Sequence, residues 1–335
     1  MLRKIVMSLA AIATLTTTTP LNAQSPTVVR MGTPALALWM LPIFVAQERG
    51  FLAEEGLSLK VNYMRGGSEA AAALIGKNID VMSGALSGAI ILRSKGVPVK
   101  VLSAVAGVRT FALVVDAKRH ATVANIQQIK GMKIATARRG SDGDLVTRVL
   151  LDDAGLSPER DVTLIQIGGY ENHLTAIEKG EVDGAMILEP FLTVGMQKGI
   201  IKPVVNLMEG QGPEALTKRI WTALSTTEEF VQSQPKIAQG LVRSFTRAVA
   251  YIDRNDEGTV EVARKFFPTM DPGLLREIVK RNVHVPRGRG YLTEVSREAL
   301  DLENNFLIGE KFISKPQKYE DVVATSMEPY WQIPR

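Results

Sequence analysis

Short turns rich in glycine and serine are the residues of this 335-residue chain best suited to hold a ligand. Unpaired backbone N–H groups at such turns, and at the helices that follow them, can bind an anion because they carry the positive end of the helix dipole. Four turns join an expected strand to an expected helix: 66–68, 84–88, 139–143 and 168–169. In any one turn, glycine could serve only to turn the chain and serine only to cap the helix. Four turns directed at one cleft would indicate a binding site.

Three other kinds of side chain could complete such a site. Glu189 ends an expected strand. Its carboxylate could accept an N–H from a ligand, or it could cap a helix that begins at Pro190. Trp39 is either part of the core or a flat surface against the ligand. Arg138 and Arg139 could bind an anion bidentately or face solvent.

Signatures of enzyme chemistry are missing from the sequence. The three histidines, His120, His173 and His284, share no metal-ligand spacing, and the chain has no cysteine. Neither a G-x-G-x-x-G fingerprint nor a Walker A loop occurs. We therefore expect no catalytic residue, no metal and no cofactor.

The first residues have the pattern of an export signal. Arg3 and Lys4 precede an apolar run over residues 5–15, and a polar stretch leads to Ala23. The run is well short of the roughly 20 residues that a membrane span needs. We expect a signal peptide at residues 1–23 and a mature protein in the periplasm. The formal charge of +5 falls to +3 without Arg3 and Lys4, and basic residues alternate with acidic ones, so we expect no nucleic-acid partner.

Strand and helix patterns alternate along residues 28–207, which predicts mainly parallel sheets covered by helices. One further strand pattern follows, and helical patterns dominate the rest of the chain. The expected strands cover residues 28–32, 57–63, 79–83, 99–105, 111–115, 133–137, 162–167, 184–188, 202–206 and 221–226.

An internal echo divides this α/β chain into two similar units. Residues 66–80 and 168–183 share a Gly-Gly-x-Glu turn and a helix, and they end before a strand in Lys-x-x-Asp and Lys-x-x-x-Asp, respectively. Two lobes follow, each a mainly parallel sheet with helices on both faces. We expect lobe one at 24–109 plus 225–335 and an inserted lobe two at 110–224. The strands at 111–115 and 221–226 are the expected crossings, which would form a hinge.

Four segments carry a family resemblance: 42–57, 66–68, 131–141 and 180–190. In this order the chain resembles the substrate-binding proteins of nitrate, sulfonate, taurine and bicarbonate ABC transporters, a family that includes the thiamine-pyrimidine precursor proteins. The resemblance implies the type II periplasmic binding fold, a small-molecule ligand between the lobes, and delivery to a membrane permease. We expect a monomer without enzyme activity. The cysteine-rich motif of the pyrimidine synthases that share this fold is absent.

The resemblance also implies where the ligand lies: after the first strand, at both glycine-serine turns and at the acid-proline pair. The candidate ligand-binding residues are Leu38, Trp39, Gly66, Gly67, Ser68, Ala85, Ser87, Arg139, Gly140, Ser141, Asp142 and Glu189. Helix N-termini favour an anion and Glu189 favours a donor, so we expect a small organic solute such as a sulfonate or carboxylate. An enzyme related to pyrimidine precursor synthesis and a binding protein that feeds a sensor receptor are the alternatives.

Overall fold

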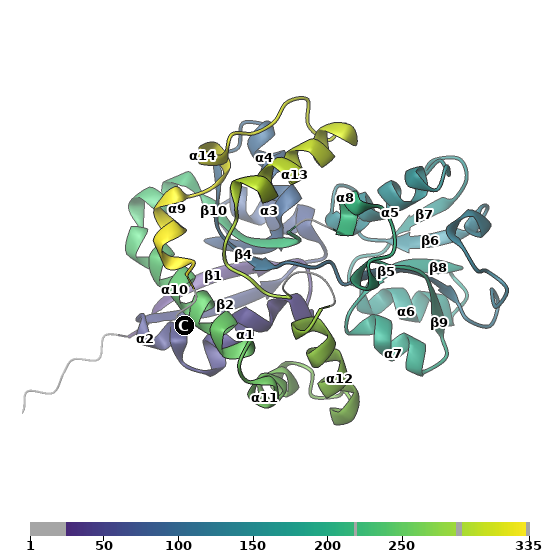
Figure 1. The fold of residues 1–335 in the computed structure, drawn as a ribbon, viewed down its shortest axis with the longest axis horizontal. Coiled ribbons are helices and arrows are strands. Elements are labelled where there is room, and N and C mark those ends of the chain that lie inside the picture. Colours follow the sequence, from purple (N-terminus) through teal and green to yellow (C-terminus); the bar gives the residue numbers. More distant parts are fainter. Residues whose placement is uncertain (1–24, 218–219, 286–289, 333–335) are drawn as a thin grey trace, which may run out of the picture.

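Two five-stranded sheets with their helices form two lobes that lie side by side in the computed structural model (Figure 1). The structure describes residues 25–217, 220–285 and 290–332. In these ranges no helix is both long and apolar enough to cross a bilayer. The expected signal peptide at 1–23 lies outside the described residues.

The first sheet has the strand order β2-β1-β3-β10-β4. Strand β1 is parallel to β2 and β3, whereas β10 runs antiparallel to both β3 and β4. These strands are β1 (Thr27–Thr33), β2 (Leu57–Tyr63), β3 (Val81–Ala85), β4 (Val99–Ala106) and β10 (Thr222–Thr227).

The second sheet repeats this plan, with the order β7-β6-β8-β5-β9 and with β5 as the antiparallel strand. Its strands are β5 (Phe111–Asp116), β6 (Lys133–Thr136), β7 (Thr163–Gln166), β8 (Gly184–Leu188) and β9 (Ile201–Asn206). Helix α3 (Gly67–Ile75) joins β2 to β3, and α6 (Glu171–Glu178) joins β7 to β8 at the equivalent position. The echo in the sequence therefore marks the same unit of each lobe, and the predicted two-lobed α/β fold is confirmed.

Helices cover both faces of each sheet (Figure 1). On the first lobe, α3 and α4 lie on one side, where α13 and α14 contact α4, while α1 contacts α10 and α11 on the other side. The helices of this lobe are α1 (Leu41–Glu48), α2 (Phe51–Glu54), α3, α4 (Leu86–Ser94), α9 (Glu228–Ser233), α10 (Pro235–Ile252), α11 (Asp256–Phe266), α12 (Pro272–Val283), α13 (Arg297–Gly309) and α14 (Tyr319–Val322). The second lobe carries α5 (Asp142–Asp153), α6, α7 (Phe191–Gln197) and α8 (Glu214–Thr217). Short 3-10 turns occur at Leu38–Met40, Ile126–Ile129, Leu207–Glu209 and Thr325–Tyr330.

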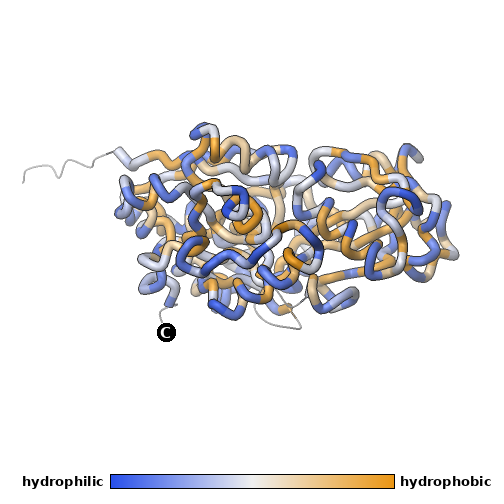
Figure 2. Tube along the Cα trace, turned by 90° about the horizontal axis from the view of Figure 1, so that it is seen from above, coloured by the Kyte–Doolittle hydropathy of each residue, from blue (hydrophilic) through white to orange (hydrophobic). Residues whose placement is uncertain are grey.

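Helix α10 shows how the apolar pattern positions an element. Leu241, Phe245 and Val249 recur at a spacing of four residues and are buried. On its other side, Arg243 forms an ion pair with Glu55. Figure 2 shows the same division on a larger scale, with hydrophobic stretches running through both lobes and hydrophilic ones frequent in the outer loops.

The chain passes between the lobes in the segments that precede β5 and β10, and not along these two strands. Strand β5 pairs with strands of the second sheet and β10 with strands of the first. The segment 107–110 therefore leads into the second lobe, and the return precedes Thr222. The expected lobe boundaries at 109/110 and 224/225 remain a proposal. Strand pairing places the whole of β10 in the first sheet.

Candidate ligand-binding site

A cavity of about 350 Å³ lies between the two lobes and receives residues from both. The first lobe contributes the segment after β1, the end of β3, faces of α3 and α4, and the start of β10. The second lobe contributes the loop between β6 and α5 and the turn before α6. Apart from the start of β10 and the later turns of α3 and α4, these are carboxyl ends of strands and starts of helices, where open α/β sheets bind ligands.

Most of the residues expected at the site line this cavity. The nine that do are Trp39, Gly67, Ser68, Ala85, Ser87, Arg139, Gly140, Ser141 and Asp142. Gly66 lies next to them, because a Cβ on it would meet the Ser141 hydroxyl at 3.0 Å. Leu38 is placed elsewhere: its side chain is fully buried in the core, and its carbonyl accepts a hydrogen bond from Tyr291 at 2.8 Å.

Glu189 also lies away from the cavity, which corrects the expected position of its carboxylate. The side chain is fully buried beneath α7, where its two oxygens accept hydrogen bonds from the backbone N–H of Thr193 at 3.1 Å and from the Thr193 hydroxyl at 2.7 Å. This is the helix-capping alternative. Burial raises the pKa of Glu189, although the Thr193 hydrogen bonds oppose the shift.

The serines of the site connect the lobes instead of capping their own helices. Ser141 precedes α5 in the N-cap position, yet its hydroxyl makes no capping bond. It accepts the backbone N–H of Ser68 at 3.5 Å and lies 3.4 Å from the Ser68 hydroxyl. Ser68 and Ser87 are each the second residue of their helix, α3 and α4. The expected helix-capping role of the serines is therefore replaced by a contact across the cleft.

Asp142, at the first position of α5, makes a second link between the lobes. Its carboxylate accepts a hydrogen bond from the indole N–H of Trp221 at 2.7 Å and lies 3.4 Å from the Ser87 hydroxyl. The guanidinium of Arg109, from the segment between β4 and β5, is 3.6 Å away and is 2% exposed. Arg109 offsets the negative charge of Asp142 only in part, because its guanidinium also lies 3.9 Å from the buried carboxylate of Glu303. An anionic group of a ligand is therefore more favourable elsewhere in the cavity.

An aromatic wall, formed by Trp39, Phe111, Tyr170 and Trp221, encloses the same part of the cavity. Ring centroids are 5.0 Å apart for Trp39 and Trp221, 5.2 Å for Phe111 and Trp221, and 5.6 Å for Phe111 and Tyr170. Burial raises the pKa of Tyr170, which keeps its hydroxyl neutral. Only Trp39 was expected at the site from sequence. Phe111 begins β5, Tyr170 lies in the turn before α6 and Trp221 directly precedes β10, and only the fold brings them together.

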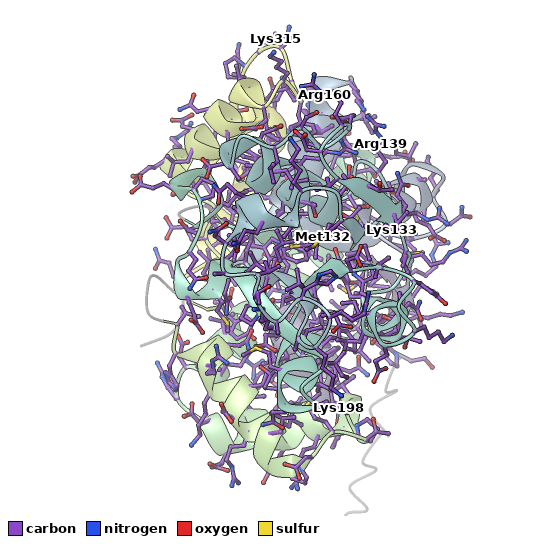
Figure 3. All side chains as sticks on the ribbon, turned by 90° about the vertical axis from the view of Figure 1, so that its right-hand side faces the viewer. Met132, Lys133, Arg139, Arg160, Lys198 and Lys315 are labelled. Carbon is purple, nitrogen blue, oxygen red and sulfur yellow. The ribbon has the colours of Figure 1, made fainter. Side chains whose placement is uncertain are left out.

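Cationic side chains surround an adjoining depression. Arg65, Arg138 and Arg139 line it, and Arg139 also lines the cavity. Arg65 is 3.5 Å from Glu69, whose carboxylate also interacts with the charge of Arg138. Arg139 forms no ion pair with an acid of the described ranges. Figure 3, which looks onto the second lobe, shows Arg139 near the upper right margin of that view. An anion at this end of the cavity would therefore meet unneutralised positive charge.

The histidines have structural contacts. His173 is buried with both ring nitrogens near backbone oxygens, those of Met186 at 2.7 Å and Ile167 at 3.0 Å. His120 contacts Asp183 and His284 contacts Asp256. Among the residues that the structure describes, no cluster of histidine and carboxylate side chains is arranged to hold a metal ion.

Sequence comparisons find a family and a relative for this chain. The model of the NMT1-like family matches residues 22–265. A candidate binding protein of Bacillus subtilis, YtlA, is 21% identical over 246 residues, which are 73% of this chain and 72% of that protein.

Solved structures share the fold. A protein of Bordetella bronchiseptica RB50 superposes with a TM-score of 0.79 at 20% identity, covering 91% of this chain and 97% of that chain. The nitrate-binding protein NrtA of Synechocystis PCC 6803 gives 0.70 at 16% identity, over 91% and 88% of the two chains. The aliphatic sulphonate binding protein SsuA of Escherichia coli gives 0.67 at 16% identity, over 92% and 100%.

Proposed function

Because the chain belongs to the NMT1-like family, we propose that it is the solute-binding component of an ABC import system and captures its ligand in the periplasm after export. The observation that carries the proposal is the cavity whose walls come from both lobes. A ligand that touches both walls favours the closed arrangement, which is how a two-lobed protein would present its cargo to a membrane permease. We propose that the protein acts as a monomer and binds its ligand without converting it.

The walls of the cavity support an organic anion as the ligand. Aromatic rings and the Asp142 carboxylate occupy one part of it, whereas Arg139, Ser68 and Ser141 lie at another. A bare inorganic anion would leave the aromatic wall without a partner. A molecule with an apolar body and a carboxylate or sulfonate group satisfies both parts, with its charged group towards Arg139. The names of SsuA and NrtA show that related folds bind sulphonates and nitrate.

A thermal-shift screen of the purified mature chain tests this function. Sulfonates, aromatic carboxylates, pyrimidines and nitrate are compared, and we expect an organic anion to raise the melting temperature most. Arg139→Gln should weaken that ligand's binding on the order of fivefold, as fits a solvent-exposed charge pair. Arg160→Gln is the matched control, because Arg160 is an exposed residue of the same lobe that lines neither cavity nor depression (Figure 3). A shift with nitrate alone would favour the inorganic anion, and catalytic turnover of any ligand would overturn the binding role.

A further inference from the structure

The cavity extends from the cleft into the first lobe between α3 and α4. Helix α3 lines it with residues 67, 68, 71, 72 and 75, and α4 lines it with residues 87, 88, 91, 92 and, just after the helix, 95. Both helices use the same spacing, so each presents one continuous face. The eight steps from residue 67 to residue 75, at 1.5 Å each, give this extension a length of about 12 Å. We call it the tail groove.

Small side chains keep the tail groove open. Gly67, Ala71 and Ala72 face it from α3, whereas Ala70 and Leu74 of the same helix are buried in the core. On α4, a Cβ added at Gly88 would meet no atom within 4 Å. Helices packed closely against each other would not leave this space.

The lining of the tail groove is apolar along most of its length. Ile91 and Leu92 are half-buried beside Met82, which comes from β3 beneath them. Ile75 is 49% exposed. Exposure of these apolar side chains to water is unfavourable, and an apolar segment of a ligand would cover them. Lys95 stands at the far end of α4.

We propose that the tail groove holds the apolar tail of an elongated anion whose charged group lies at Arg139, Ser68 and Ser141. This inference rests on the proposed function and specifies its ligand: a chain or ring system longer than a simple two-carbon sulfonate. The two parts are continuous, because the residues around the charged group and those of the tail groove line one cavity. The charged group remains away from Asp142.

A homologous series of linear alkanesulfonates, from methanesulfonate to octanesulfonate, tests the groove by titration calorimetry. Each methylene that enters the groove should tighten binding about fourfold, which corresponds to about 0.8 kcal/mol. Gly88→Leu places a side chain in the groove, and the open space at its Cβ means that the fold can accept it. In this variant the gain with chain length should disappear for the longer members. Gly309→Leu, at the exposed end of α13, is the matched control and should keep the wild-type gain.

The outcomes separate this inference from the proposed function. If short sulfonates bind and longer ones gain nothing, or if the gain persists in Gly88→Leu, the tail groove is wrong while the binding role stands. If no sulfonate of any length binds, a sulfonate is wrong as the charged group, and a matching series of linear alkanecarboxylates then decides the groove. An affinity that increases with chain length in the wild type, and no longer does so in Gly88→Leu, would support the tail groove. An affinity that does not depend on chain length in the wild type would overturn it.

Discussion

The buried carboxylate of Glu189 makes the stability of this molecule depend on pH. Thr193 is its hydrogen-bond partner, and its charged neighbours are the guanidinium of Arg281, 4.0 Å away, and the carboxylate of Glu277. Because burial raises its pKa, the protonated form is favoured in the folded state. The stability that this provides is present at low pH and is lost as the pH rises through the folded-state pKa.

The free energy of unfolding of Glu189→Gln, relative to that of the wild type, should therefore increase as the pH increases. Urea unfolding at pH 4 and pH 8 measures the difference in free energy of unfolding between the two proteins, and we expect this difference to move in favour of the variant at pH 8. Ligand affinity should stay within about twofold, since Glu189 does not line the cavity. An equal difference at both pH values would contradict the raised pKa, and a large loss of affinity would return Glu189 to the ligand.

At the scale of elements, the turn between β2 and α3 determines how closely the lobes approach. Gly66 has φ of 142°, a conformation that favours glycine, and it faces the Ser141 hydroxyl of the other lobe. A side chain added at residue 66 would be strained by this backbone conformation and would also displace Ser141. The contact between Ser68 and Ser141 depends on this close approach.

Gly66→Ala should cost roughly 1 to 3 kcal/mol of stability and also weaken ligand binding. Gly56→Ala is the control, because Gly56 has φ of 68° but a Cβ there would meet no atom within 4 Å. Both variants carry backbone strain, and only the first should lose affinity. Thermal unfolding and calorimetry measure the two effects; equal affinities in the two variants would show that the turn does not control the approach of the lobes.

At the scale of the whole molecule, polar contacts bridge the cleft between the lobes. Ser68 with Ser141, and Trp221 with Asp142, join elements of different lobes. These few polar contacts can break and reform as the lobes move.

A saturating ligand should therefore close the lobes and raise stability. At one hundred times its dissociation constant it adds about 2.7 kcal/mol, which means a melting shift of a few degrees for a chain of this size. Small-angle scattering should show a smaller radius of gyration with ligand than without. A melting shift with no change of radius would leave binding intact but exclude hinge closure.

The sequence by itself determined the elements and much of the site. Strand and helix patterns that follow one another along the chain predicted ten strands, each of which overlaps an observed strand. The echo at 66–80 and 168–183 predicted two similar lobes. Glycine-serine turns after strands predict site residues from local sequence, because strand ends and helix starts meet at the edge of a sheet where ligands bind. Nine of the twelve expected residues line the cavity for this reason.

Only the tertiary structure decided which way Glu189 faces, which rings form the aromatic wall and where the tail groove runs. Glu189 lies close to a strand end, but the helix that follows takes up its carboxylate. Phe111, Tyr170 and Trp221 are far apart in sequence and read as ordinary strand or helix residues, because no local pattern encodes a contact between lobes. The tail groove depends on the distance between two helices, which the packing of whole elements sets and no single segment specifies.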